Sequence, residues 1–243
     1  MGRRPSPRGV PAGSKGTHRD RPEPPLSRAV EDYVKTIYHL SHRGGFASTA
    51  RIAERLGVSR PSVSIMVKHL SEGGLVEHVP YRGAQLSPQG RRAALRVIRR
   101  HRVLELYLTR ELGYDWSNVH DEAERLEHGV SDQLISRIAD ALGNPRYDPH
   151  GEPIPTDAGE IEEPDLVALA EARLGGEFEL RQVAMQDRAR LRFLAEAGLV
   201  PGVTLTVTDR QPFNGPTTVQ LGAAVRVVER DLALLLWCRE VAA

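Results

Sequence analysis

The sequence is poor in cysteine. Cys238 is the only cysteine among 243 residues, which excludes an internal disulfide framework and a zinc site built from several thiolates. A chain with so few thiols is typical of a reducing compartment. We therefore expect a cytoplasmic protein.

Long apolar runs are missing as well. The longest, around Leu232 to Trp237, is far shorter than the roughly 20 residues that a membrane-spanning helix needs. The arginine-rich beginning of the chain has no apolar core of the kind found in signal peptides. We therefore expect a soluble protein that is not exported and has no membrane partner.

An excess of charge of either sign is also lacking, because the formal net charge is only +1 at pH 7. A nucleic-acid partner would have to be bound by a local basic patch and cannot be inferred from the overall charge. The length is sufficient for two or three compact units, each with its own core.

Two segments rich in proline and glycine divide the chain. Residues 1–25 contain several arginines and show no apolar periodicity, which predicts a disordered basic tail. This tail is either an unselected extension or a segment that makes loose phosphate contacts. Asn144 to Pro164 is rich in proline, glycine and acidic residues and predicts a linker.

The region between these segments predicts a winged helix-turn-helix. Residues 49–56 and 60–72 have helical patterns and are joined by Gly57-Val58-Ser59, a short glycine-containing turn. Residues 75–79 and 84–86 flank Pro80-Tyr81-Arg82-Gly83 and predict a two-stranded hairpin.

The second of these helices has one apolar stripe, which leaves Ile65 among serines on the opposite face. An isoleucine there can contact a thymine methyl group while serines bond base edges or phosphates, although single exposed apolar residues are common. Arginines at helix starts and at the hairpin tip suit phosphate or minor-groove contact. The candidate DNA-contacting residues are Thr49, Arg51, Ser59, Arg60, Pro61, Ser62, Ser64, Ile65 and Arg82.

Two further helices carry residues of the types that bind metal ions. His101 and Glu105 are one turn apart on a helix predicted from Ser87-Pro88 to Arg110. On a helix beginning near Ser117, one sector of about 100° contains His120, Glu124, Glu127 and His128. Carboxylates at i and i+3 with a histidine at i+4 can close on one divalent ion. The alternatives are a satisfied core histidine and a solvated acidic face.

The sequence resembles the diphtheria-toxin-repressor type of metalloregulators, and within it the manganese-responsive branch. The resemblance is strong over about residues 27–155 and weaker over 178–241. It is carried by EDYVKTIY, RIAERLGVS, RRH with Glu105 after it, VHDEAERLEH, DPHGEPIP and GLVPG. It implies a mainly α-helical winged helix-turn-helix and dimerisation region followed by a small SH3-like β-barrel. The expected units are a tail (1–25), a DNA-binding domain (26–90), a helical metal-binding and dimerisation domain (91–155), a linker (156–175) and an SH3-like domain (176–243).

The resemblance also implies two metal sites. The primary ligands correspond to Asp32, His101, Glu124, Glu127 and His128. A second site corresponds to Glu105, Asp148, His150 and Asp187, with Gln186 as the neighbouring candidate and an ordinary turn as the alternative for residues 148–151. His120 is a ligand in the iron-responsive relatives, and the alternative for it here is a supporting role.

The resemblance favours Mn²⁺ as the metal. Iron-responsive relatives have a methionine and a cysteine where this chain has Asp32 and Glu124, and replacing sulfur with oxygen favours Mn²⁺. The same donors also bind Fe²⁺, Co²⁺ or Zn²⁺. Lys35 stands where the small two-domain manganese regulators carry a glutamate, which puts their closely spaced pair of metal ions in doubt.

The function that follows is a homodimeric, metal-dependent repressor that binds double-stranded DNA at a palindromic operator. One alternative is an Fe²⁺-responsive repressor of the same family, and another is a winged-helix regulator with a small organic ligand. A metalloenzyme with Glu127 as general base is disfavoured, because a full set of protein ligands leaves little room for a substrate.

Overall fold

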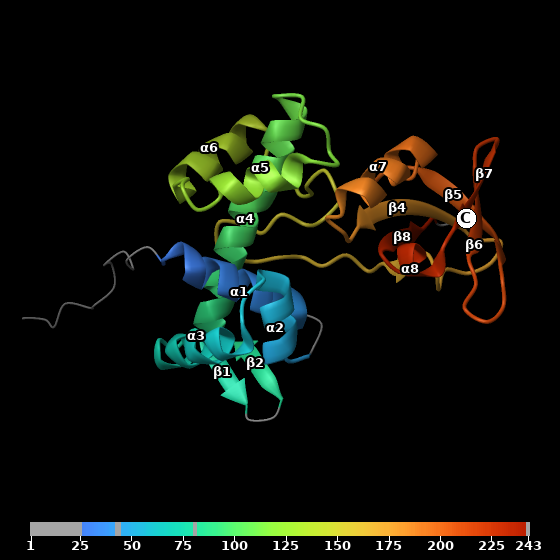
Figure 1. Cartoon of the computed structure of the whole chain (residues 1–243). Coiled ribbons are helices and arrows are strands. Elements are labelled where there is room, and N and C mark those ends of the chain that lie inside the picture. The colour runs from blue at the N-terminus through green and yellow to red at the C-terminus, as the bar shows by residue number, and fades with distance from the viewer. Residues whose placement is uncertain (1–25, 42–44, 80–81, 242–243) are drawn as a thin grey trace, which may run out of the picture.

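The computed structural model describes residues 26–41, 45–79 and 82–241, so the expected basic tail lies outside the described residues. Figure 1 shows three units along the chain: a winged helix-turn-helix, a helical region, and a sheet-containing C-terminal unit. No helix of the described ranges is long and apolar enough to cross a membrane.

The first unit contains α1 (Arg28–Ser41), α2 (Thr49–Leu56), α3 (Arg60–Glu72), β1 (Val76–Val79) and β2 (Gly83–Leu86). Ser48 caps α2, and Ser59 caps α3 with Pro61 in the first turn. Gly57 has φ of 64°, a left-handed conformation that suits glycine and lets the chain turn between the two helices. β1 and β2 pair in antiparallel register, Val76 opposite Leu86, and form the predicted wing.

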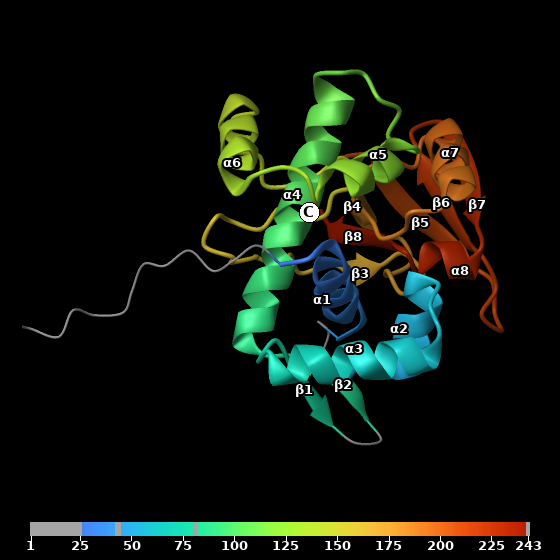
Figure 2. The same ribbon diagram turned by 60° about the vertical axis from the view of Figure 1, so that its left-hand side comes forward.

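The helical region consists of α4 (Pro88–Arg110), α5 (Val119–Leu126) and α6 (Asp132–Ala141). Figure 2 shows α4 as a long helix that runs from the winged unit to the level of α5 and α6. Its first half packs Leu95 and Ile98 into the winged-helix core, whereas its second half packs Val103 and Leu104 into the core of the helical region. The expected boundary between residues 90 and 91 therefore lies inside a helix that both units share.

The C-terminal unit is a six-stranded antiparallel sheet with two short helices. Its elements are β3 (Val167–Ala168), β4 (Glu177–Val183), α7 (Arg188–Ala197), β5 (Thr204–Arg210), β6 (Thr217–Leu221), β7 (Ala224–Val228), α8 (Arg230–Ala233) and β8 (Leu236–Glu240). The strand order is β3-β8-β4-β5-β6-β7. Leu169, Ala170 and Ala172 belong to its core, so this unit begins near residue 167, inside the segment expected to be linker (156–175). The predicted fold class, mainly helical followed by a small SH3-like β domain, is confirmed.

Candidate metal centre

Three segments distant in sequence supply the candidate ligands. Asp32 lies in the first turns of α1, His101 and Glu105 lie one turn apart on α4, and α5 carries His120 and Glu124. The sequence pattern predicted one helix through residue 130, but α5 ends at Leu126 and a turn follows. Glu127 keeps a helical backbone, with φ of −56° and ψ of −30°, so it and the next residue stay beside Glu124.

The residues implied as the primary site come together in the structure. Asp32, Glu124, Glu127 and His128 each offer a ligand atom, and these atoms all lie within 4.8 Å of one another. His101 Nδ1 is 2.5 Å from Glu127 Oε2 and 3.6 Å from Glu124 Oε2. Glu127 is fully buried. The group therefore joins α1 of the winged unit to α4 and α5 of the helical region.

A lysine also occupies this group. Lys35 Nζ donates to Glu124 Oε2 at 2.7 Å and to both carboxylate oxygens of Glu127 at 2.8 Å. Although burial acts to raise the pKa of Glu124, the adjacent Lys35 lowers it below its ordinary value. Burial raises the pKa of Asp32, and the nearby carboxylates of Glu124 and Glu127 act in the same direction.

His128 shows that the group suits a cation. Its Nδ1 lies 2.6 Å from Glu31 Oε2, and because an ionised carboxylate can only accept, Nδ1 donates this hydrogen bond. In the neutral imidazole Nε2 then carries the lone pair. Nε2 is buried and makes no hydrogen bond within the described ranges, although Asp32 Oδ1 lies 2.9 Å away. A divalent ion bound to both His128 Nε2 and Asp32 Oδ1 would give each atom a partner. Oxygen and nitrogen ligands fit such an ion.

A second group borders the first. Glu105, Asp148 and His150 have candidate ligand atoms within 4.8 Å of one another, and all three residues are buried. His150 Nε2 donates to the Trp116 carbonyl oxygen at 3.0 Å, which leaves Nδ1 facing Glu105 Oε2 at 3.8 Å. Asp148 Oδ1 accepts from the backbone N–H groups of His150 and Glu152, so the segment is also an ordinary capped turn.

His120 belongs to a third group, with His101 and Glu105. His101 Nε2 is 2.9 Å from Glu105 Oε1 and 2.9 Å from His120 Nδ1. Glu105 Oε1 also lies 3.1 Å from His120 Nδ1, so Glu105 contacts both histidines and faces His150 as well. The two implied sites are therefore adjacent. His101, which contacts the primary group, also contacts Glu105, which belongs to the second group.

Asp187 is not a member of these groups among the described residues. Its Oδ1 caps α7 by accepting from Arg190 N at 2.8 Å. Gln186, the neighbouring candidate, lines a small cavity together with Glu105, Asp148 and His150. In sequence, an aspartate directly before an arginine-rich helix suits an N-cap as well as a metal ligand.

Burial and neighbouring carboxylates shift the pKa values of His150, His101 and Asp148. Burial acts to lower the pKa of His150, but Glu105 and Asp148 raise it to about 9. Burial acts likewise on His101, and the neighbouring Glu105 raises the pKa of His101 to about 9. Burial and the adjacent carboxylates raise the pKa of Asp148 to about 7. In the metal-free protein at neutral pH, both histidines are therefore protonated.

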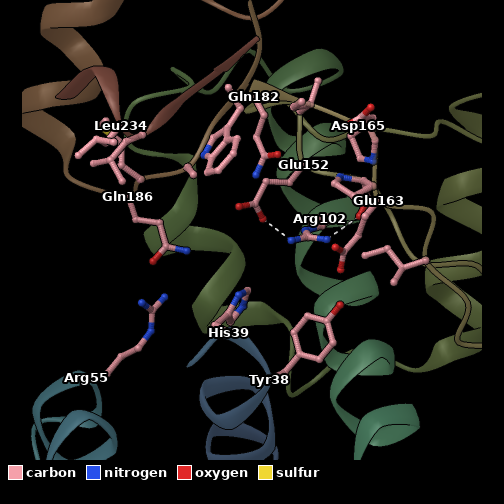
Figure 3. Close-up of a pocket in the computed structure, with 18 of the residues that line it drawn as sticks. Tyr38, His39, Arg55, Arg102, Glu152, Glu163, Asp165, Gln182, Gln186 and Leu234 are labelled. Carbon is pink, nitrogen blue, oxygen red and sulfur yellow. Dashed lines mark hydrogen bonds and ion pairs between the residues drawn. The ribbon is translucent and has the colours of Figure 1, made fainter. Parts of the chain in front are cut away.

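A larger cavity of about 730 Å³ opens between the winged unit and the C-terminal unit. Figure 3 shows Arg102 and Glu152 pointing toward each other in its interior, with His39 and Arg55 on the side of α1 and α2. Arg102 also donates to the Pro153 carbonyl oxygen at 2.5 Å. The ion pair between Arg102 and Glu152 thus ties α4 to the segment that enters the C-terminal unit.

The candidate DNA-contacting residues lie on the helix-turn-helix and the wing. Ile65 is 73% exposed, while Val63 and Val67 on the opposite face of α3 are buried. Arg82 stacks its guanidinium over the ring of Phe46, 4.6 Å from the ring centroid. Arg51 lines the interdomain cavity. Thr49 is half-buried, and the remaining candidates, Ser59, Arg60, Pro61, Ser62 and Ser64, are exposed.

Glu31 and Arg100 are residues of this region that sequence reasoning missed. Glu31 stands between His128 Nδ1 and Arg100 Nη1, which lies 2.8 Å from Glu31 Oε1. An acidic residue in the first turn of a helix is favourable by itself, and this local role accounts for Glu31 in the sequence. Its position next to Asp32 was an available signal, but its partners are 69 and 97 residues away.

Comparison with known proteins gives three domain matches in the same order. Residues 25–84 match the iron dependent repressor N-terminal DNA binding domain, and residues 87–156 match the iron dependent repressor metal binding and dimerisation domain. Residues 167–240 match the FeoA domain. The start of this last match coincides with β3 in the structure.

Whole-chain relatives have the same kind of function. The chain is 36% identical over 197 residues to the diphtheria toxin repressor of Corynebacterium glutamicum, which covers 76% of this chain and 86% of the relative. It is 36% identical over 206 residues to the iron-dependent repressor IdeR of Mycobacterium tuberculosis, covering 80% and 89%. A solved manganese-dependent transcriptional repressor in complex with manganese superposes with a TM-score of 0.80 and 38% identity, over 87% of this chain and all of the other. These findings confirm the resemblance noted from sequence motifs. The chain therefore belongs to the iron-dependent repressor family and is a metal-dependent transcriptional repressor, not an enzyme.

Proposed function

We propose that this repressor responds to Mn²⁺ and binds a near-palindromic operator as a homodimer in the cytoplasm. The observation that carries the choice of metal is the donor set of the primary group. Asp32 and Glu124 contribute carboxylate oxygens, and no sulfur atom lies among the candidate ligands of the described residues. Oxygen-rich sites suit Mn²⁺ better than sites with sulfur ligands do.

The residues that would hold the ion are Asp32 on α1, His101 on α4, and Glu124, Glu127 and His128 on or just after α5. A divalent cation supplies charge neutralisation there and links the winged unit to the helical region. Asp32 is the member of this set from the winged unit. Its attachment to the α5 ligands therefore fixes the orientation of α1, which packs directly on α2 of the reading unit.

In a dimer, the orientation of α1 affects DNA binding because it sets the separation of the two winged units. Residues 87–156 match a metal binding and dimerisation domain, so each partner presents one winged unit. Two half-sites on DNA need a defined separation of the recognition helices. We infer that the winged units sample several separations when Asp32 is not held by the ion, and one productive separation when it is.

A second ion would be held by Glu105, Asp148 and His150, with a contribution from the C-terminal unit. We infer that Gln186 makes that contribution in place of Asp187, because Gln186 lines the same cavity and Asp187 caps a helix. The His150 carbonyl oxygen accepts from Val183 N in β4 at 2.9 Å, so this group already adjoins the C-terminal unit. We infer that the second site locks that unit onto the helical region.

An Fe²⁺-responsive repressor is the second candidate, because the curated relatives at 36% identity include an iron-dependent repressor. One titration distinguishes the two. Metal-free protein is titrated with Mn²⁺, Fe²⁺ and Zn²⁺ while binding to its own promoter DNA is followed, in parallel with Glu127→Ala. The proposal expects the largest gain in DNA affinity at the lowest concentration for Mn²⁺, and no response of the variant. A stronger response to Fe²⁺ would favour the iron-responsive repressor. Strong DNA binding without any metal ion would contradict both the manganese and the iron proposals.

A further inference from the structure

Lys35 places a positive charge inside the primary metal group. Its Nζ is within 2.8 Å of one oxygen of Glu124 and both oxygens of Glu127, and 3.3 Å from His101 Nδ1. Its side chain is only 10% exposed. The ammonium group therefore contacts three of the five residues that would hold the ion, and the other two, Asp32 and His128, lie 2.9 Å apart.

A metal ion and this ammonium group compete for the same atoms. Both oxygens of Glu127 already accept hydrogen bonds from Lys35, and the carboxylate is fully buried. A divalent ion held by these oxygens would bring a second centre of positive charge within a few ångströms of the ammonium group, beside a fully buried carboxylate. Like charges at that distance repel strongly where the dielectric constant is low.

The Lys35 side chain borders a cavity into which it can move. A cavity of about 640 Å³ borders Lys35, Glu124 and Gln186 and opens toward solvent beside α2. A lysine has a flexible stem of four carbons, so the ammonium group can turn outward while α1 stays in place. The position of Asp32, one turn earlier on the same helix, need not change when Lys35 moves.

We propose that Lys35 is an internal cation that occupies the place of the metal ion in the metal-free protein and leaves when the ion binds. This inference rests on the proposed function. Lys35 stabilises the metal-free protein by neutralising Glu124 and Glu127, and for the same reason it weakens the apparent affinity for the ion. It thereby sets the metal concentration at which the repressor responds. It also contributes a positive charge where a second, closely spaced ion would need another carboxylate.

The competition predicts effects of opposite sign on stability and on affinity. Lys35→Met keeps a long unbranched side chain and removes the charge. In chelator, the buried Glu127 then loses the ammonium group and keeps His101 as its cationic neighbour among these ligands, so the urea midpoint of the metal-free variant falls below that of the wild type. In calorimetric titrations without DNA, the variant binds Mn²⁺ at least about tenfold more tightly, because no internal competitor has to be displaced. A lysine with only a structural role would lower both quantities.

Lys68→Met is the matched control, because Lys68 is the other lysine of the described ranges and is exposed on α3. It leaves both the metal-free midpoint and the Mn²⁺ affinity unchanged. Lys35→Gln repeats the test with a shorter neutral side chain if Lys35→Met does not fold in chelator. Equal or weaker Mn²⁺ binding by the folded variant, while the wild type binds Mn²⁺, would overturn the competition and leave the proposed function standing. A wild type that binds no Mn²⁺ would remove both.

Discussion

His128 donates from Nδ1 to Glu31 Oε2 over 2.6 Å, which connects the turn after α5 to the first turn of α1. This contact decides which nitrogen of the imidazole is available to a metal ion. Glu31 is in turn held by Arg100, whose Nη1 lies 2.8 Å from Glu31 Oε1. An arginine, a glutamate and a histidine thus form a chain of contacts that ends at the primary group.

The first prediction concerns this chain of contacts. Glu31→Ala removes the partner of His128 Nδ1, so the imidazole loses its fixed orientation, and the affinity for Mn²⁺ falls by about 10–100-fold. Calorimetric titration of metal-free protein measures this change. Asp132→Asn is the control, because Asp132 is the other carboxylate partner of Arg100 and does not touch His128. Equal affinities of the wild type and Glu31→Ala would show that Glu31 does not position the ligand.

The second prediction tests the attachment of the C-terminal unit at the Pro-His-Gly segment. Gly151 has φ of 80°, and a Cβ atom built on it would lie 1.7 Å from the Arg181 carbonyl oxygen in β4. Gly143 has φ of 81° and open space around the same position. Gly143→Ala therefore reports the backbone strain alone, about 1 kcal/mol.

Gly151→Ala adds a steric clash to that strain, and we expect about 1–3 kcal/mol of further destabilisation. Urea unfolding of both variants gives the difference. Identical losses in the two variants would mean that β4 does not pack against Gly151 in solution.

Helix caps and helical spacing explain why much of this fold could be predicted. Ser59 with Pro61, and Ser87 with Pro88, are local signals that act within a few residues, and α3 and α4 begin there. The pairing of His101 with Glu105 follows in the same way from one turn of helix. These features depend on neighbours in sequence, and no tertiary information is needed to find them.

The rest of the site depends on how the units pack. Lys35 reaches Glu127 across 92 residues, and Glu31 reaches His128 across 97. A helical wheel gives the direction in which Lys35 points, but it does not say which helix lies opposite. Asp32 was accessible only through resemblance for this reason. The structural role of Asp187 was hidden because an aspartate at the same position suits an N-cap and a ligand equally well.

The third prediction is a loss of stability of the metal-free protein at alkaline pH. His101 and His150 have pKa values of about 9 in the folded chain, above the ordinary value of 6.5. Their stabilising contribution is therefore complete below pH 6.5 and disappears as the pH rises through 9. Each of the two protons contributes a slope of up to about 1.4 kcal/mol per pH unit.

Urea midpoints in chelator between pH 6.5 and 9.5 measure this slope. His150→Gln removes one of the two titrating groups and makes the slope shallower, whereas His69→Gln, an exposed change on α3, leaves it unchanged. A stability that is flat or increases over this range would contradict the assignment of protonated histidines.

The fourth prediction separates the two metal sites. His150→Ala removes the ligand Nδ1 that faces Glu105, so the protein binds one Mn²⁺ per chain in place of two. Gln186→Ala weakens the second ion, whereas Asp187→Ala lowers stability by about 1 kcal/mol through loss of the α7 cap and leaves both ions bound. Metal content after dialysis, together with urea unfolding, tests these outcomes. Loss of the second ion in Asp187→Ala alone would assign the ligand to Asp187.

We propose that metal binding and operator binding are coupled through Asp32. The most direct test measures Mn²⁺ affinity with and without operator DNA, and operator affinity with and without Mn²⁺, in the wild type and in Asp32→Asn. Linkage requires the operator to tighten Mn²⁺ binding by the same factor by which Mn²⁺ tightens operator binding. We expect equal factors well above one in the wild type and a factor near one in Asp32→Asn. Mn²⁺ affinity that does not change when the operator is bound would contradict it.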